Sequence, residues 1–130
     1  MINDDIKSLV EKTNRFFESS ILFFDANDYD STVSRVYYAM FFITETLLLT
    51  KNLVTKSHSG LIALFRDHFI KTNIFSKEMG RLLNRAYVKR LIRDYGTSIT
   101  IDKDETQKIL KEGQKFIDCI IKYLEDNKYI

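Results

Sequence analysis

The sequence predicts an all-α protein, an up-and-down bundle of four long helices plus one short helix. Its 130 residues include no proline and only four glycines, so few positions would interrupt a helix. Apolar residues recur at spacings of three and four through most of the chain, which is the period of an amphipathic helix. No stretch has the pattern of a strand, and no linker or internal repeat divides residues 1–130. We therefore expect a single helical domain.

The stretch 34–50 should be the helix around which the others pack. Every residue from Val36 to Ile43 is apolar or aromatic, so no helical phase leaves a fully polar face toward water. A buried strand is the alternative for a short apolar run, but this run is too long for a strand and contains no turn residue. One side of the helix is mixed and should form a half-exposed seam: Arg35, Tyr38, Phe42 and Glu45.

The segment before this central helix, residues 4–25, carries apolar side chains at helical spacing and should form an amphipathic helix. Residues 26–28, with the sequence Ala-Asn-Asp, have the composition of a turn. The central helix should accordingly begin near Tyr29 or Asp30.

Residues 51–56 break the helical pattern, and two serines are placed to start the helices that follow. Ser57 is a suitable N-cap for a short helix over about 59–70, and Ser76 is a suitable N-cap for a fourth helix that runs to about residue 94. Gly96 is placed to end that fourth helix.

The last helix should begin at Asp102. With Glu105 three residues later, this aspartate has the form of a capping box, and the helix should continue to about residue 127. Its apolar face comprises Ile109, Leu110, Phe116, Ile117, Ile120 and Leu124.

The composition excludes several classes of protein. With 45% hydrophobic and 29% charged residues, the chain is typical of a globular domain and not of a disordered one. No apolar run approaches the roughly 20 residues of a membrane-spanning helix, and no targeting stretch precedes the first helix, so we expect a cytoplasmic protein. The single cysteine, Cys119, cannot form an internal disulfide and should be a packed core thiol.

No cofactor and no metal are expected. The sequence has no glycine-rich phosphate loop, which argues against a nucleoside-triphosphate hydrolase. Two separated histidines, His58 and His68, and one cysteine give no metal-ligand spacing.

The connectivity predicts which residues meet at one end of the bundle. If consecutive helices alternate in direction, the second and the fourth are parallel, and the segments that follow them share one end. That arrangement would bring His58 toward Arg90, Asp94 and Tyr95, and it would leave Arg35 at the other end. His58 could there cap a helix, donate to a backbone carbonyl, or act as an acid or base.

The fourth predicted helix has a conspicuous charge pattern. Five cationic side chains lie between Glu78 and Asp94 with no acidic residue among them: Arg81, Arg85, Lys89, Arg90 and Arg93. Together they form a positive surface that suits the phosphates of RNA or a nucleotide, or an acidic partner. The alternative is a solvated face whose cations pair with acids on neighbouring helices, and both interpretations remain open.

Three short segments, by their order and spacing along the chain, indicate a family: SRVYYAMF at 34–41, KSHSG at 56–60 and RLIRDYG at 90–96. Together they resemble the small stand-alone HEPN-domain proteins of prokaryotes, over most of the chain. The resemblance implies a helical bundle that forms a homodimer, often with a minimal nucleotidyltransferase as its partner, the two behaving as toxin and antitoxin.

For active members, the resemblance also implies a metal-independent endoribonuclease. An arginine, four to six intervening residues and a histidine would form a composite site across the dimer. The arginine would hold the scissile phosphate and stabilise its developing charge. The histidine would move protons while the ribose 2′-hydroxyl attacks, which leaves a cyclic phosphate.

This sequence departs from that motif at the histidine. Arg90 is followed by four residues and then by Tyr95, whose phenol has an ordinary pKa of about 10 and is a poor general base near neutral pH. Tyr95 could still donate a hydrogen bond to a phosphate, and Asp94 could hold Arg90 or Arg93 in place. Any catalysis would pair Arg90 with His58 or with Tyr95.

Three functions therefore remain open. The first is a binding module, a HEPN homodimer that engages a nucleotidyltransferase and binds RNA or nucleotide through Arg81, Arg85, Lys89 and Arg93 without cutting. The second is a ribonuclease toxin, and the third is a purely structural oligomeric bundle. Because like charges facing each other across a two-fold axis repel, we expect the basic face to border a dimer cleft in which a phosphate bridges it.

Overall fold

The computed structural model describes residues 2–95 and 101–130, and for Ile2 and residues 93–95 it describes the backbone alone. Every regular element within these residues is helical. The elements are α1 (Ile2–Asp25), α2 (Tyr29–Leu49), α3 (His58–Phe65), the π-helical turn η1 (Arg66–Ile70), α4 (Lys77–Tyr95) and α5 (Lys103–Asp126). The predicted all-α bundle of four long helices and one short helix is confirmed.

Side-chain caps set where three of these helices begin. Asp28, Ser57 and Asp102 each accept a hydrogen bond from the backbone N–H three residues later, at 3.2, 2.9 and 2.8 Å. Each bond satisfies a donor that the first turn of a helix leaves open. The predicted caps at Ser57 and Asp102 are confirmed, whereas the predicted helix stop at Gly96 lies outside the described residues.

α2 is buried along most of its length because α1, α3, α4 and α5 all contact it. The predicted burial of its apolar run on several sides is confirmed. The mixed seam is half-buried as expected at Arg35, Tyr38 and Glu45. Phe42 is more buried than expected, since the ring of Phe16 on α1 packs edge-on against it at a centroid distance of 4.9 Å.

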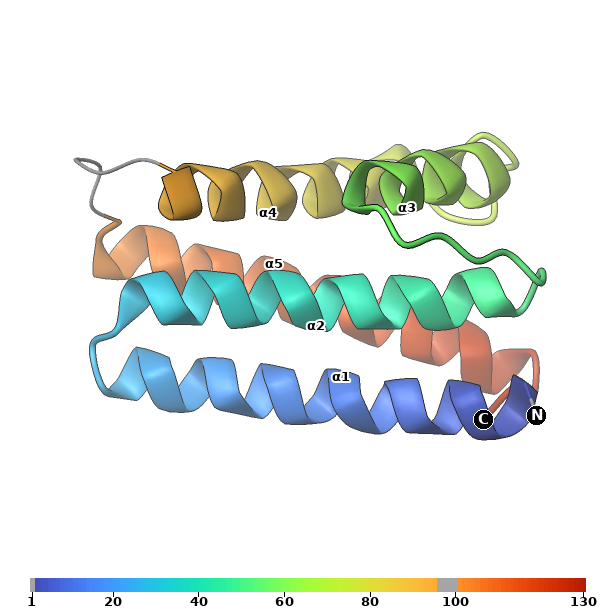
Figure 1. Ribbon diagram of the computed structural model, residues 1–130, viewed down its shortest axis with the longest axis horizontal. Helices are drawn as coiled ribbons and strands as arrows, with labels where there is room; N and C mark the ends of the chain where they lie inside the picture. Colours follow the sequence, from blue (N-terminus) through green and yellow to red (C-terminus); the bar gives the residue numbers. More distant parts are fainter. Residues whose placement is uncertain (1, 96–100) are drawn as a thin grey trace.

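The four long helices run alternately up and down the bundle, while α3 does not span it (Figure 1). The irregular segment 50–57 leaves the C-terminal end of α2 and turns back along that helix (Figure 1). His58, at the start of α3, consequently reaches Tyr37 in the first half of α2. α4 then runs antiparallel to α2, so its C-terminal end lies near the N-terminal end of α2 (Figure 1).

Two of the predictions about connectivity are wrong for this reason. α2 and α4 are antiparallel rather than parallel, because segment 50–57 carries the chain back before α3 begins (Figure 1). α3 therefore runs in the direction of α2, and α4 runs opposite to both (Figure 1). Arg35 is not at the far end from Arg90. Its guanidinium instead packs over the rings of Phe16 and Phe23 on α1, at 4.9 and 5.8 Å from their centroids.

The crossing of α2 and α5 depends on Gly113. A Cβ atom at this position would lie 2.5 Å from Cγ1 of Val36, which is closer than two carbon atoms can approach without a shift. Both residues are buried, so the space for such a shift is small. The absence of a side chain at Gly113 allows α5 to lie directly against the central helix.

We expect Gly113→Ala to destabilise the fold, since overpacking a core costs about 1–3 kcal/mol. Gly80→Ala is the matched control, because its new Cβ would meet Ile70 at 3.6 Å, an ordinary contact. That control should gain up to about 1 kcal/mol from helix propensity. Thermal unfolding followed by circular dichroism measures both variants, and equal melting temperatures would contradict the close approach of α5 to α2.

Candidate functional site

The chemistry-bearing side chains meet where the start of α3 lies against the first half of α2. The hydroxyl of Tyr37 lies 2.6 Å from Nδ1 of His58. Tyr37 is fully buried on α2, and His58 is half-buried in the first turn of the helix that Ser57 caps. The hydrogen bond therefore joins two side chains held by separate helices.

Aromatic rings surround the imidazole of His58. Its ring centroid lies 4.7 Å from that of Phe41, 5.6 Å from Tyr37, and 6.0 Å from both Tyr38 and Tyr87. The planes of His58 and Tyr87 differ by only 14°, so these two rings are stacked. Packing of this kind restricts the orientation of the imidazole.

Arg90 closes the same cluster from α4. Its guanidinium lies 5.1 Å from the ring centroid of Tyr38 and 5.7 Å from that of Tyr37, within the range of cation–π interactions. The predicted approach of His58 and Arg90 is therefore confirmed, although the path of the chain that produces it differs from the predicted one. We call these six side chains the Tyr37–His58 cluster: Tyr37, Tyr38, Phe41, His58, Tyr87 and Arg90.

Burial favours the uncharged form of both hydrogen-bonding partners. It lowers the pKa of His58 below its ordinary value of 6.5, and the nearby charge of Arg90 lowers that pKa further. Burial also raises the pKa of Tyr37 well above its usual range, although Arg90 opposes this shift. A phenol that stays protonated needs an acceptor, so we assign Tyr37 as the donor to Nδ1, which leaves the proton of the neutral imidazole on Nε2.

Four members of the cluster were not singled out as site residues by sequence reasoning: Tyr37, Tyr38, Phe41 and Tyr87. The first three lie within the SRVYYAMF segment, and Tyr87 lies three residues before Arg90. The signal was thus the aromatic SRVYYAMF segment. Their pairing with His58 depends on the return of segment 50–57, which has no local signature.

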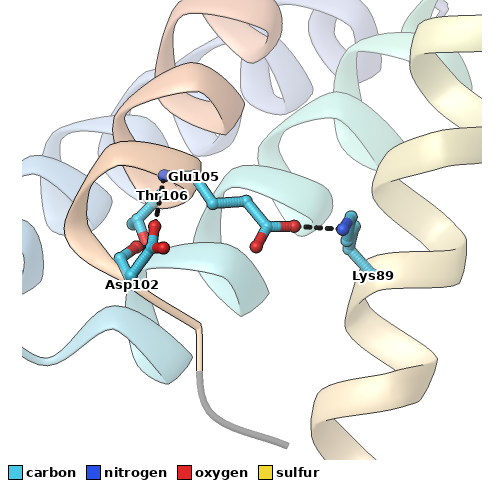
Figure 2. A network of polar contacts seen from close by, with 4 residues as sticks. All are labelled: Lys89, Asp102, Glu105 and Thr106. Atoms are coloured by element: carbon cyan, nitrogen blue, oxygen red, sulfur yellow. Dashed lines mark hydrogen bonds and ion pairs between the residues drawn. The ribbon is translucent and has the colours of Figure 1, made fainter.

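The cations of α4 have acidic neighbours. Lys89 forms an ion pair with Glu105 on α5, and Asp102 caps α5 beside it (Figure 2). Arg85 pairs with Glu112 on α5 at 3.3 Å. These pairs are what the solvated-face interpretation expects, but partly exposed ion pairs contribute only about 0–1 kcal/mol and exchange partners readily.

Of the remaining cations of the predicted basic face, the structure describes the side chain of Arg81 but not that of Arg93. Arg81 is 70% exposed and lies 3.6 Å from Glu78 on its own helix. The side chains of Arg93, Asp94 and Tyr95 lie outside the described residues, so their predicted roles as phosphate ligand, support and catalytic phenol remain predictions.

Metal-binding and membrane-spanning features are not found in the part of the chain that is described. No group of three or more His, Cys, Asp or Glu side chains in residues 2–95 and 101–130 is placed to hold a metal ion. None of the described helices is long and apolar enough to cross a bilayer. Cys119 is half-buried against the core, and burial raises the pKa of its thiol.

Comparison with known proteins places the chain among small prokaryotic proteins. A family model described as "HEPN domain" matches residues 6–124. The chain is 38% identical to "Putative toxin MJ0142" of Methanocaldococcus jannaschii over 120 residues, which cover 92% of this chain and 82% of that protein. "Putative toxin MJ0605" of the same organism is 32% identical over 125 residues, 96% of this chain and 92% of that protein. A "UPF0332 protein" of Thermotoga maritima is 37% identical over 98 residues, 75% of this chain and 74% of that protein.

Replacing Tyr37 by phenylalanine should change the tautomer of His58. The variant lacks the hydroxyl that donates to Nδ1, a bond worth about 1 kcal/mol, so the proton is no longer restricted to Nε2. Tyr87→Phe is the matched control because it removes a hydroxyl from the cluster and keeps the stacked ring. Nitrogen-15 NMR of the imidazole reads the tautomer directly, and an Nδ1-protonated ring in the unmodified protein would contradict our assignment.

The stability of the fold should fall as the pH drops below the ordinary pKa of histidine. Because the pKa of His58 is lowered in the folded state, the unfolded chain binds more protons below pH 6.5. The stability that the lowered pKa of His58 contributes is fully present above that pH. It is lost as the pH falls toward the pKa of His58 in the folded state. We expect His58→Gln to show a shallower loss of unfolding free energy between about pH 7 and about pH 5 in urea titrations. Parallel pH profiles for the two proteins would show that His58 is not the group responsible.

Proposed function

This chain belongs to the HEPN domain family, and on that premise we propose that it is a homodimeric module of a toxin–antitoxin-type system that binds RNA or nucleotide without cutting it. Two of its relatives carry the name "Putative toxin", which supports the first part of this proposal. The module would act in the cytoplasm, with a minimal nucleotidyltransferase as its partner. Its ribonuclease motif would be degenerate.

The observation that carries this proposal is the state of His58. The motif position of the catalytic histidine is occupied by Tyr95, so His58 is the histidine available to replace it near Arg90. Its Nδ1 lies 2.6 Å from the hydroxyl of Tyr37, which we assign as the donor, and burial and the charge of Arg90 lower its pKa. With the proton on Nε2, the neutral imidazole is a donor at that nitrogen. It cannot take a proton from a ribose hydroxyl at that nitrogen, which is what a ribonuclease base must do.

A donor is still useful for binding. The Nε2–H group of His58 and the guanidinium of Arg90 are both suited to oxygen atoms of a phosphate. Arg81, Arg85, Lys89 and Arg93 would extend this positive surface along α4. In the homodimer that we propose, this face borders the cleft, and a bound phosphate group bridges the like charges that would otherwise repel.

One observation favours the second candidate, a ribonuclease toxin. Arg90 and His58 both contact the ring of Tyr37, so a phosphate stabiliser and a titratable group occur in a single cluster. In that mechanism Arg90 stabilises the charge that develops on the phosphate. The proton would have to leave through His58, after its bond to Tyr37 rearranges, or through Tyr95.

Incubation of the purified protein with a structured RNA in the presence of a chelator tests the two candidates together. Retention of labelled RNA measures binding, and end analysis of any fragments measures cleavage. We expect binding without cleavage. Arg90→Ala should weaken binding about tenfold, which corresponds to the loss of ~1.5 kcal/mol of charged hydrogen bonding.

Arg15→Ala is the matched control, since it removes one exposed arginine from α1 and should change binding little. Fragments with cyclic-phosphate ends that disappear in both Arg90→Ala and His58→Ala would establish the ribonuclease and overturn the binding module. If the protein neither binds nor cuts RNA, the structural oligomer is the remaining function. The sedimentation behaviour of the protein would then be the relevant measurement.

A further inference from the structure

A groove between α3 and α4 lies outside the Tyr37–His58 cluster. It has a volume of about 750 Å³ and follows η1 and the first half of α4. Apolar residues line it from α3 and η1, namely Ile62, Phe65 and Ile70. From α4 it is lined by Gly80, the polar Asn84 and Val88. Gly80 adds no side chain there, and a Cβ atom at this position would meet Ile70 at 3.6 Å.

Four cations surround this apolar lining: Arg66, Lys77, Arg81 and Arg85. None of the described residues that line the groove is acidic. Arg66 and Arg81 are 55% and 70% exposed, and their acidic neighbours Asp67 and Glu78 lie on their own elements. Exposed pairs of this kind are weak, so a carboxylate from outside the molecule can replace them at little cost.

The apolar surface continues along α4 beyond the groove. Val88 is 43% exposed and Ile92, one turn further, is 37% exposed. From Lys77 to Ile92 the helix rises about 22 Å, which is roughly four helical turns. The surface is therefore about four turns long and combines apolar with cationic side chains, with the polar Asn84 between Gly80 and Val88.

We propose that this groove binds an amphipathic helix of another protein, with an apolar stripe flanked by Asp and Glu side chains. Such a helix would place its stripe on Ile62, Ile70 and Val88, and its carboxylates against Arg66 and Arg81. Helix-in-groove recognition needs apolar anchors at the spacing of one helix face, and the length of this surface accommodates three or four of them.

Three other occupants fit the surface less well. A second copy of this chain would bring four cations against four identical cations across a two-fold axis. A bilayer is flat, and a concave groove would leave its lining out of contact with the lipid. RNA has phosphates for the cations, but the aliphatic lining offers its sugars and bases no hydrogen bonds, and Phe65 is too buried to stack on a base.

Occupation of the groove has a consequence that rests on the proposed function. Arg81 and Arg85 belong both to the groove and to the surface proposed to bind phosphate. A bound acidic helix would cover these two residues and compete with RNA. The groove would then be the place where a protein partner regulates nucleic-acid binding.

The test is a selection from a display library of helical peptides of about 14 residues, roughly four turns, on the intact protein. Leucine is fixed along one face of each peptide, and all other positions are randomised. We expect Asp and Glu to be enriched beside the leucines. The enriched peptide should shift the NMR amide signals of η1 and α4.

Charge-reversal variants identify the surface that is used. Arg66→Glu combined with Arg81→Glu should weaken the enriched peptide at least about tenfold, as loss of two charge pairs does in protein interfaces. Gly80→Leu, which fills the groove and leaves its charges intact, should also weaken it. Lys108→Glu on the exposed side of α5 is the matched control and should leave binding unchanged.

Several results would overturn the proposal: no enrichment of acidic residues, or enriched peptides that bind the double variant as well as the unmodified protein. Loss of binding to anionic phosphatidylglycerol vesicles in Gly80→Leu would assign the groove to a membrane, and loss of RNA binding in the same variant would assign it to nucleic acid. If the protein binds the peptide but no RNA, the groove proposal stands and the proposed function fails. The two failures are therefore distinguishable.

Discussion

The structure depends on the need to cover an apolar helix on every side. The run from Val36 to Ile43 on α2 has no polar face, and leaving it in water would cost roughly 1.5–3 kcal/mol for each large side chain. Three long helices cover much of α2, and α3 covers part of the remaining surface. The return of segment 50–57 along α2 is therefore a consequence of the apolar run, and it carries His58 to Tyr37.

The same burial determines the chemistry of the cluster. A histidine in water near its ordinary pKa exchanges between charged and neutral forms, whereas His58 lies among four aromatic rings next to a cation. Both conditions favour the neutral imidazole, and the protonated phenol of Tyr37 then selects its tautomer. The cluster thus brings this imidazole and the guanidinium of Arg90 to the same two tyrosine rings.

The charges of α4 are divided between two sides of the helix. Lys89 faces α5, where Glu105 meets it, whereas Arg81 and Lys77 border the groove shared with α3. Arg85 lines the groove and also pairs with Glu112. A net charge of +2 conceals this arrangement, because it sums 20 cationic and 18 acidic residues over the whole chain. The position of each cation therefore decides which partner it can meet.

The sequence by itself determined the helices, the caps at Ser57 and Asp102 and the burial of α2, because helical periodicity and N-caps are set by residues within a few positions of one another. The motif segments also predicted the family, which the matching family model shows. Only the tertiary structure decided that α2 and α4 are antiparallel, that Tyr37 holds His58, and that Arg90 lies over two tyrosine rings. These contacts join residues 21 or more positions apart. They depend on how an irregular segment crosses the surface of α2, and the free energy that selects its path comes from burial in the assembled bundle rather than from the segment's own residues.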